Sequence, residues 1–279
     1  MTETRIPSRV FPDATQGAVD AEKIVHTAQT DSPSYKLAFQ DNDFLLRPDL
    51  RPVRFQLELL KPELFLDEAN IASTMVFYGS ARIPAPGVKS QNPDPKIAAR
   101  LEANSWTYAE ARKLAAMASG TPRDQDGKRH FVVCSGGGPS IMEAANLGAR
   151  DVGAESIGLN IVLPHEQAPN PYVTPTLSFQ FHYFALRKMH FLLRARAVAV
   201  FPGGFGTFDE TFELLTLIQT GKIKPMPILM FGRDFWNRVV NFEALVEEGV
   251  ISPRDLEIFR FVDTAEEAWQ IVQDFYAVS

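Results

Sequence analysis

A glycine-rich turn in the last third of the chain holds the residues best suited to bind a charged ligand. An apolar run over residues 197–201 ends at Pro202, and apolar side chains at helical spacing follow from Thr207 to Gly221. Between the two segments stand three glycines, Gly203, Gly204 and Gly206. This order predicts a strand, a tight turn and a helix. The free N–H groups and the positive dipole end of such a helix favour a phosphate or another anion.

Two carboxylates, Asp209 and Glu210, follow this turn on the first turn of the expected helix. Their spacing has a structural interpretation, because Thr207-x-x-Glu210 matches a capping box, in which the glutamate bonds back to the cap N–H. The same pattern occurs at Ser140-x-x-Glu143 and at Thr264-x-x-Glu267. On spacing alone, capping is the favoured interpretation of Glu210 and a catalytic role is the alternative.

Composition excludes several classes of function. The 279 residues can form one large α/β domain or two small ones, and 45% of them are apolar, as in ordinary globular proteins. A net charge of −6 argues against a nucleic-acid interface. No apolar run is long enough for a membrane helix, and the N-terminus lacks a secretory signal. With Cys134 as the single cysteine, a cytoplasmic location is expected.

Strand and helix patterns alternate from residue 73 to the end of the chain. This predicts a doubly wound, mostly parallel, Rossmann-like α/β sheet with helices on both faces. The expected strands are 74–78, 131–134, 156–162, 177–183, 197–201, 227–231 and 258–262. The expected helices are 97–117, 141–149, 185–195, 207–220, 235–248 and 265–276.

The segment before this domain is expected to be an N-terminal extension. Residues 1–35 are polar with little periodicity, so they are expected to be mobile or to lie on a neighbouring subunit. Residues 36–70 predict one or two short helices, with Pro62 at a helix start or at a kink. The predicted organisation is therefore an extension over 1–70 and a Rossmann-like domain over 71–279.

Three glycine-bearing turns follow predicted strands, at Gly79, at residues 136–138 and at residues 203–206. In a parallel sheet the carboxyl ends of the strands share one edge, so these turns are expected to converge on one crevice. Their number favours a phosphorylated ligand over mere close packing. None of them matches the sequence of a nucleoside triphosphatase loop or of a standard dinucleotide site.

Other candidate groups give weaker signals. The pair Arg187-Lys188 lies among apolar neighbours, so it is either a solvated helix face or a boundary of a buried site. The five histidines form no metal-binding pattern, and His165-Glu166 is an isolated pair in the proline-rich loop 163–173, which could be a lid or a pocket wall. Cys134 ends a predicted buried strand and is interpreted as a core residue, and Ser135 as a hydroxyl near the phosphate.

Residues 202–210, PGGFGTFDE, fit the P-G-G-x-G-T-x-x-E motif, and the chain resembles the Lonely guy (LOG) family of nucleoside 5'-monophosphate phosphoribohydrolases. These proteins often carry the label "lysine decarboxylase-like". The resemblance covers about residues 73–278, and Arg187-Lys188 and the turn at 136–138 fit it too. The segments GGGPSIMEAAN, SIGLNIVLPHEQAPNPYV and LTLIQTGKI, with the 70-residue extension, look more like the longer bacterial branch than the short plant enzymes.

The resemblance implies hydrolysis of the N-glycosidic bond of a nucleoside monophosphate, which is either a cytokinin riboside monophosphate or AMP, to free base and ribose 5-phosphate. It implies that Arg187 and Glu210 are the essential catalytic pair, which reverses the interpretation from spacing. It implies no metal and no cofactor. The expected substrate-binding residues are Ser80, Arg82, Gly136, Gly137, Gly138, Glu143, Lys188, Gly203, Gly204, Gly206 and Thr207.

Two other functions stay open. A pyridoxal-phosphate decarboxylase would need a Schiff-base lysine, for which Lys188 is the candidate nearest the motifs. A non-catalytic carrier of a phosphorylated pterin cofactor would use the same glycine turns, although the presence of both Arg187 and Glu210 argues against it.

The base and the oligomer size are not predicted. An apolar base pocket could be lined by Phe181, Tyr183, Phe184 or Met189, which could equally be core residues. A homo-oligomer is expected from the family, with the central helix 207–220 and residues 36–70 as the candidate interface.

Overall fold

The computed structural model describes residues 13–164 and 168–277 of the chain. It divides into two compact units, Met1–Leu57 and Glu58–Ser279. The division falls inside one helix, α3 (Arg51–Glu68).

The first unit contains short helices. Helix α1 (Ala14–Ala21) is capped by Asp13, whose carboxylate accepts a bond from the Gln16 N–H at 2.8 Å. Helix α2 (Asn42–Leu45) begins after Asp41. Of the segment expected to be mobile, residues 1–12 lie outside the described residues. Helix α3 continues through Pro62, so the alternative that a helix starts at this proline is wrong.

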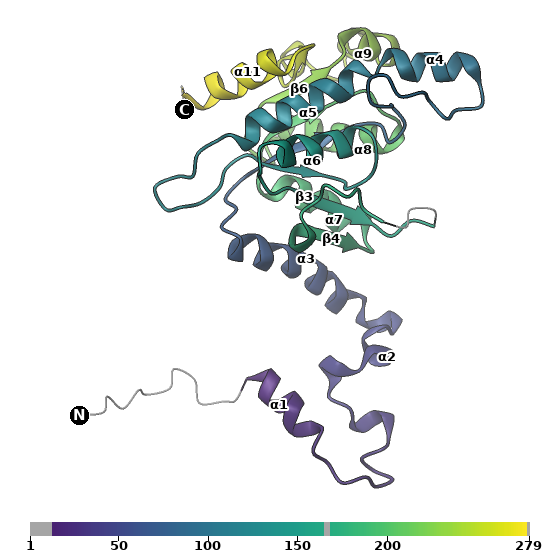
Figure 1. Ribbon diagram of the computed structural model, residues 1–279, viewed down its shortest axis with the longest axis vertical. Coiled ribbons are helices and arrows are strands. Elements are labelled where there is room, and N and C mark those ends of the chain that lie inside the picture. Colours follow the sequence, from purple (N-terminus) through teal and green to yellow (C-terminus); the bar gives the residue numbers. More distant parts are fainter. Residues whose placement is uncertain (1–12, 165–167, 278–279) are drawn as a thin grey trace. The chain divides into compact units, whose positions relative to one another are not determined.

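The second unit is built on one seven-stranded sheet, in which every strand is parallel to its neighbours (Figure 1). The strand order is β4-β3-β2-β1-β5-β6-β7. The strands are β1 (Thr74–Tyr78), β2 (Val132–Ser135), β3 (Ile157–Ile161), β4 (Ser178–Phe181), β5 (Ala195–Val200), β6 (Ile228–Phe231) and β7 (Arg260–Val262). This confirms the doubly wound parallel sheet predicted from the alternating pattern.

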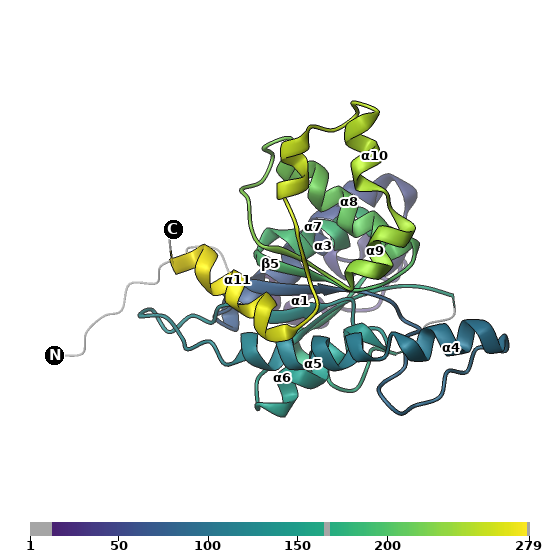
Figure 2. The same ribbon diagram turned by 90° about the horizontal axis from the view of Figure 1, so that it is seen from above.

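Helices cover both faces of this sheet (Figure 2). Their bounds are α4 (Pro95–Ala103), α5 (Trp106–Ser119), α6 (Ile141–Asp151), α7 (Phe184–Leu193), α8 (Phe205–Gln219), α9 (Arg233–Val239), α10 (Phe242–Glu247) and α11 (Ala265–Ala277). Short 3-10 helices occur at Pro33–Tyr35, Ala38–Gln40, Pro48–Leu50, Pro175–Leu177 and Pro253–Glu257. Helices α5, α6 and α11 pack on one face, and α7 and α8 on the other.

The central strands are buried on both sides, which explains their continuous apolar sequence. All five residues of β1 are buried, and so are all four of β6. Alternate side chains of each strand enter opposite core layers, so that Val76 and Tyr78 pack beneath α7 and α8, whereas Met75 and Phe77 pack beneath α5 and α6.

Two expected helices are each broken into two. The expected helix 97–117 is α4 followed by α5, because the Asn104 N–H bonds to the Leu101 carbonyl and its side-chain amide donates to the Arg100 carbonyl, which ends the first helix. The expected helix 235–248 is α9 followed by α10, because Asn241 turns the chain and caps α10 through the Ala244 N–H. Asparagine favours such caps over a helix interior.

The strand order reverses between β1 and β5. The chain moves outward from β1 to β4, returns to β5 on the other side of β1, and then continues outward to β7. Such a reversal opens a crevice beyond the carboxyl ends of the two central strands. The turns that start at Gly79 and at Pro202 lie there, joined by a bond from the Ser80 N–H to the Pro202 carbonyl at 3.0 Å.

Candidate active site

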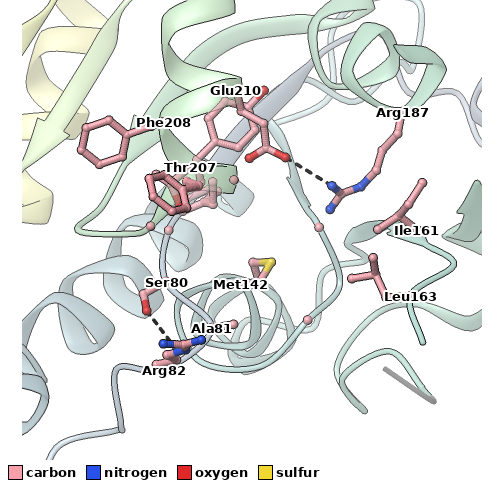
Figure 3. A pocket seen from close by; sticks show the side chains of 18 of the residues that line it. Ser80, Ala81, Arg82, Met142, Ile161, Leu163, Arg187, Thr207, Phe208 and Glu210 are labelled. Atoms are coloured by element: carbon pink, nitrogen blue, oxygen red, sulfur yellow. Dashed lines mark hydrogen bonds and ion pairs between the residues drawn. The ribbon is translucent and has the colours of Figure 1, made fainter. Parts of the chain in front are cut away.

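A cavity of about 900 Å³ opens at this reversal point. Its walls come from the ends of β1 and β3, from the glycine turns after β2 and β5, and from helices α6, α7, α8 and α9 (Figure 3). The three glycine turns expected to converge are therefore at one site, each contributing at least one residue to the walls.

Helix α8 presents a free N-terminus to this cavity. It begins at Phe205 after Gly204, which has no side chain to cap it. The N–H groups of the first three residues have no carbonyl partner within the helix. Thr207 is buried inside this first turn and is not the cap. The capping box expected at Thr207 and Glu210 is therefore wrong, because the helix starts earlier and Glu210 lies in its second turn.

The helix after the second glycine turn, α6, also lacks a side-chain cap. Ser140 stands before it with φ at 67°, and its hydroxyl donates to the Ile83 carbonyl instead of accepting from the helix. Glu143 accepts a bond from the Tyr108 hydroxyl at 3.2 Å. The second expected capping box is thus absent too, and the first-turn N–H groups of Met142 and Glu143 stay free of cap bonds.

The third pattern behaves differently, far from the cavity. The Thr264 hydroxyl accepts from the Glu267 N–H at 3.2 Å, and the Glu267 carboxylate accepts from the Asp263 N–H at 3.3 Å. Both side chains bond to backbone N–H groups at the start of α11, as capping requires. The two capping patterns that follow glycine turns, at 140–143 and 207–210, therefore do not form capping boxes, and the first-turn N–H groups of their helices have no side-chain cap.

Two buried asparagines hold the turn after β2 in place. The Asn170 side-chain amide donates to the carbonyls of Gly137 and Gly138 at 3.1 and 3.0 Å and to the Asn146 side chain at 2.9 Å. Asn146 also accepts from the Ser135 hydroxyl at 2.8 Å, and that hydroxyl accepts from the Gly137 N–H. A fully bonded buried network of this kind fixes the backbone of the turn.

Arg187 and Glu210 meet across the cavity (Figure 3). Nη1 of Arg187 donates to Oε1 of Glu210 at 3.3 Å, and Nε donates to the Leu159 carbonyl at 2.7 Å. The guanidinium lies over the Phe191 ring at 5.1 Å. Only 11% of the Arg187 side chain and 12% of the Glu210 side chain are exposed. This is a desolvated ion pair with a fixed geometry.

Burial raises the pKa of Glu210 to about 7, although the nearby charge of Arg187 opposes the shift. Asp209 adds to the increase by repulsion. A carboxyl group with this pKa is close to half ionised at neutral pH, which suits a group that exchanges protons or stabilises a developing cation. Strongly shifted carboxyl groups in clefts are typical of functional sites.

Most of the predicted site residues line the cavity. These are Ser80, Arg82, Gly136, Gly138, Arg187, Gly204, Gly206, Thr207 and Glu210. The other four predicted residues do not line the cavity. Gly137 packs against Asn160 with φ at 73°, Gly203 lies against the Thr207 side chain, and Glu143 is bonded to Tyr108. Lys188 pairs with Asp209 at 3.1 Å and with Glu213 at 3.2 Å.

The sequence analysis did not predict most of the apolar residues that line the cavity. Of the four suggested base-pocket residues, only Phe184 lines the cavity, whereas Phe181 is buried in the core. The other apolar lining residues are Phe77, Tyr78, Ala81, Met142, Ile161, Leu163, Phe205, Phe208 and Val239. Met142 and Ile161 flank motifs that the sequence did reveal, so proximity to a glycine turn or to the end of a strand was the available signal.

Cys134 and the candidate metal ligands do not form a second site among the described residues. Cys134 is buried, and burial raises the pKa of its thiol, as expected of a core residue. Among residues 13–164 and 168–277, no three side chains of histidine, cysteine, aspartate or glutamate form a metal-binding group. His165 and Glu166 lie outside the described residues. Within the described part of the chain, no helix is long and apolar enough to cross a membrane.

A family sequence model described as "Possible lysine decarboxylase" matches residues 142–272, which include Arg187, the turn at 202–207 and Glu210. The chain is also 28% identical over 148 residues to the cytokinin riboside 5'-monophosphate phosphoribohydrolase LOG3 of Arabidopsis thaliana, covering 52% of this chain and 67% of the relative. The chain is therefore similar to the phosphoribohydrolases of the LOG family over about half of its length.

The chain is also similar to a further curated protein and to two solved structures, all at low identity. A probable cytokinin riboside 5'-monophosphate phosphoribohydrolase of Oryza sativa subsp. japonica is 32% identical over 91 residues, covering 32% of this chain and 43% of the relative. Among solved structures, the molybdenum cofactor binding protein of Rippkaea orientalis matches with a TM-score of 0.44 and 15% identity, covering 73% of this chain and 98% of that one. The molybdenum cofactor carrier protein of Chlamydomonas reinhardtii gives 0.41 and 15%, covering 74% and 99%.

Proposed function

We propose that this protein hydrolyses the N-glycosidic bond of a nucleoside 5'-monophosphate to free base and ribose 5-phosphate. The observation that carries the proposal is the desolvated pair of Arg187 and Glu210, whose side chains meet in a cavity bordered by two uncapped helix N-termini. The substrate is a cytokinin riboside monophosphate or AMP.

Glu210 has the properties that the bond cleavage needs. As the bond from C1' to the base nitrogen breaks, its electron pair leaves with the base and positive charge develops on the ribose. A carboxylate beside C1' stabilises this oxocarbenium-like state and accepts a proton from the attacking water. Burial strengthens both effects, because the field of a charge is less screened in a desolvated site.

The N-terminus of α8 suits the substrate phosphate. Its first three N–H groups are free, and the positive end of the helix dipole faces the cavity. Glu210 lies five residues beyond the first residue of α8, or roughly 7 Å along the axis. A phosphate held at the helix end would place the ribose alongside this second turn, so that binding energy from a remote group positions the reacting bond.

The position of Arg187 suits an interaction with the base of the substrate. It lies between Glu210 and the turn after β2, close to the apolar side chains of Met142, Ile161 and Leu163 (Figure 3). A base in this apolar part of the cavity would be within reach of the guanidinium, which could stabilise negative charge on the leaving nitrogen. It also holds Glu210 in place through the ion pair.

The decarboxylase alternative finds less support. Lys188 is the candidate for a Schiff base, yet it does not line the cavity. Burial lowers the pKa of Lys188, but its hydrogen bonds with Asp209 and Glu213 outweigh this effect and leave the pKa raised. A Schiff base forms from the neutral amine, so these contacts oppose the chemistry.

The test is incubation of the protein with AMP and with N6-isopentenyl-AMP, with free base followed by chromatography. Wild-type protein is expected to release base, and Glu210→Ala and Arg187→Ala are each expected to lose at least 100-fold of the rate. Glu213→Ala is the matched control, since this carboxylate lies one turn further along α8 and pairs with Lys188.

The same experiment separates the alternatives. No base release from either nucleotide, together with a phosphorylated ligand that copurifies, would support the carrier function. An absorbance band of an internal aldimine in the purified protein would support the decarboxylase. The ratio of the two hydrolysis rates identifies the preferred base.

A further inference from the structure

Helix α7, which carries Arg187, has an N-terminus that its own sequence does not cap. The residue before the helix is Tyr183, and no side chain of that residue accepts a bond from the first turn. Instead Glu58 of α3 supplies a carboxylate. One oxygen accepts from the His182 N–H at 2.9 Å and the other from the Tyr183 N–H at 3.2 Å. These N–H groups belong to the two residues just before the helix, and the carboxylate that holds them comes from a residue 125 positions before Tyr183 in the chain.

A continuous series of hydrogen bonds links this carboxylate to the cavity. The Tyr183 carbonyl accepts from the Arg187 N–H at 3.1 Å, which is the first bond of α7. The Arg187 side chain in turn donates to Glu210. Tyr183 therefore joins the two contacts, because its N–H bonds to Glu58 and its carbonyl accepts from the Arg187 N–H. A shift at the Glu58 contact would displace the guanidinium from its partners.

The remainder of α7 is fixed to the same segment of α3. His190 is buried, and its Nε2 lies 3.1 Å from the Glu58 carbonyl. Just after the helix, Arg194 donates to the Glu63 carboxylate at 2.9 Å and to Asp67 at 2.8 Å. Helix α3 thus contacts α7 at its start, near its middle and at its end. Only the contact at the start adjoins Arg187.

We propose that Glu58 is a positioning residue, which holds the two residues before α7 so that Arg187 faces Glu210. Two features of the Glu58 contact carry this inference: the carboxylate bonds two consecutive N–H groups, and it places negative charge at the positive end of the helix dipole. Glu58 lies outside the PGGFGTFDE motif and outside the family match at 142–272. Its effect on turnover rests on the proposed function.

The structural part of the test is amide hydrogen exchange of the segment 182–187. Glu58→Ala is expected to speed exchange there by about tenfold or more, because two hydrogen bonds to a charged carboxylate are lost. Glu58→Gln keeps an oxygen acceptor and is expected to restore most of the protection. Glu68→Ala is the matched control, because Glu68 is an exposed glutamate at the end of the same helix.

The kinetic part compares Glu58→Ala with Glu63→Gln, which weakens the contact at the other end of α7. Glu58→Ala is expected to lower kcat by about tenfold with little change in KM, because the phosphate site on α8 is intact while Arg187 is misplaced. Glu63→Gln is expected to keep kcat within about twofold, and Glu58→Gln to recover most of it.

Each outcome decides the proposal. Equal losses of kcat in Glu58→Ala and Glu63→Gln would show that α3 acts only as a general support and would overturn it. Unchanged exchange at 182–187 in Glu58→Ala would overturn it as well, whatever the activity. Wild-type protein without turnover would refute the proposed hydrolysis alone, and faster exchange confined to this segment would still support the positioning role.

Discussion

At the residue scale, the ion pair of Arg187 and Glu210 is a costly arrangement for stability alone. Burying two charges costs hydration free energy, and the attraction between the charges offsets this cost only in part. Here the carboxyl pKa of about 7 shows that the loss outweighs the attraction for Glu210. A strained electrostatic environment of this kind is typical of a site selected for chemistry.

The ionisation of Glu210 predicts how turnover depends on pH. If the carboxylate is the active form, kcat is expected to rise about tenfold between pH 6 and pH 8, as a group with a pKa near 7 loses its proton. Asp209→Asn removes a charge that raises this pKa, so the rise is expected to move to lower pH. Measurement of kcat at saturating AMP checks both expectations, and a flat profile would contradict the role of Glu210.

Gly136 is predicted to be required because the Arg187 side chain occupies the space beside it. A Cβ at residue 136 would lie 2.5 Å from Nη2 of Arg187. The guanidinium cannot retreat freely, because Glu210 holds it through Nη1 and the Leu159 carbonyl holds it through Nε. Gly136→Ala is expected to lower kcat at least tenfold. Gly138→Ala is the control, because its Cβ would meet only the flexible end of Met142. Similar kinetics of the two variants would argue against a fixed Arg187.

At the element scale, the strands were readily predicted and the helix ends were not. Buried parallel strands give uninterrupted apolar runs, and β1 occupies the predicted residues 74–78. The start of α8 was misplaced because Thr207-x-x-Glu210 is a capping pattern in sequence, whereas Glu210 has a partner on another helix. A contact between residues 23 positions apart is invisible to local spacing. The contact of Glu58 with the residues before α7 was missed for the same reason.

The open N-terminus of α8 predicts a specific effect of Gly203. A Cβ there would lie 2.2 Å from Oγ1 and 2.6 Å from Cβ of Thr207, which is packed in the first turn of the helix. Gly203→Ala must therefore shift this turn, and affinity for ribose 5-phosphate is expected to fall about tenfold or more. Lys222→Ala, an exposed substitution beyond the other end of α8, is expected to change it less than threefold. Calorimetric titration measures both, and equal affinities would place the phosphate elsewhere.

At the scale of the whole molecule, the reversal of strand order between β1 and β5 brings the glycine turns to one crevice. The sequence predicted that these turns would share an edge, because parallel strands end on the same side. It did not fix which strands are neighbours, and so it could not identify the apolar wall that Met142, Ile161 and Leu163 form together. Met142 belongs to α6, whereas Ile161 and Leu163 lie at the end of β3 and just after it, and only the folded arrangement brings these two segments together.

The free energy of unfolding of the protein is expected to depend on pH because the Glu210 carboxyl group is buried. The pKa of Glu210 is raised from 4.5 to about 7 on folding, so between these values the folded state binds more protons than the unfolded state. The free energy of unfolding therefore falls as pH rises through this window, by about 3 kcal/mol at most. In Glu210→Gln this contribution is absent. Urea unfolding of both proteins at pH 5 and pH 8 tests it, and parallel pH profiles would contradict the shifted pKa.

The exposed apolar side chains of α3 predict self-association. Leu60 and Leu64 lie one helical turn apart in Glu58–Ser279, and their exposed fractions are 53% and 56%. Burying each against a second copy would stabilise an assembly by about 1.5 to 3 kcal/mol at most. The wild-type protein is therefore expected to sediment as a dimer or larger species. The double variant Leu60→Glu with Leu64→Glu is expected to dissociate at concentrations where Lys61→Glu, an exposed substitution on the same helix, does not. A monomeric wild-type protein at these concentrations, or equal dissociation of both variants, would exclude this helix as the interface.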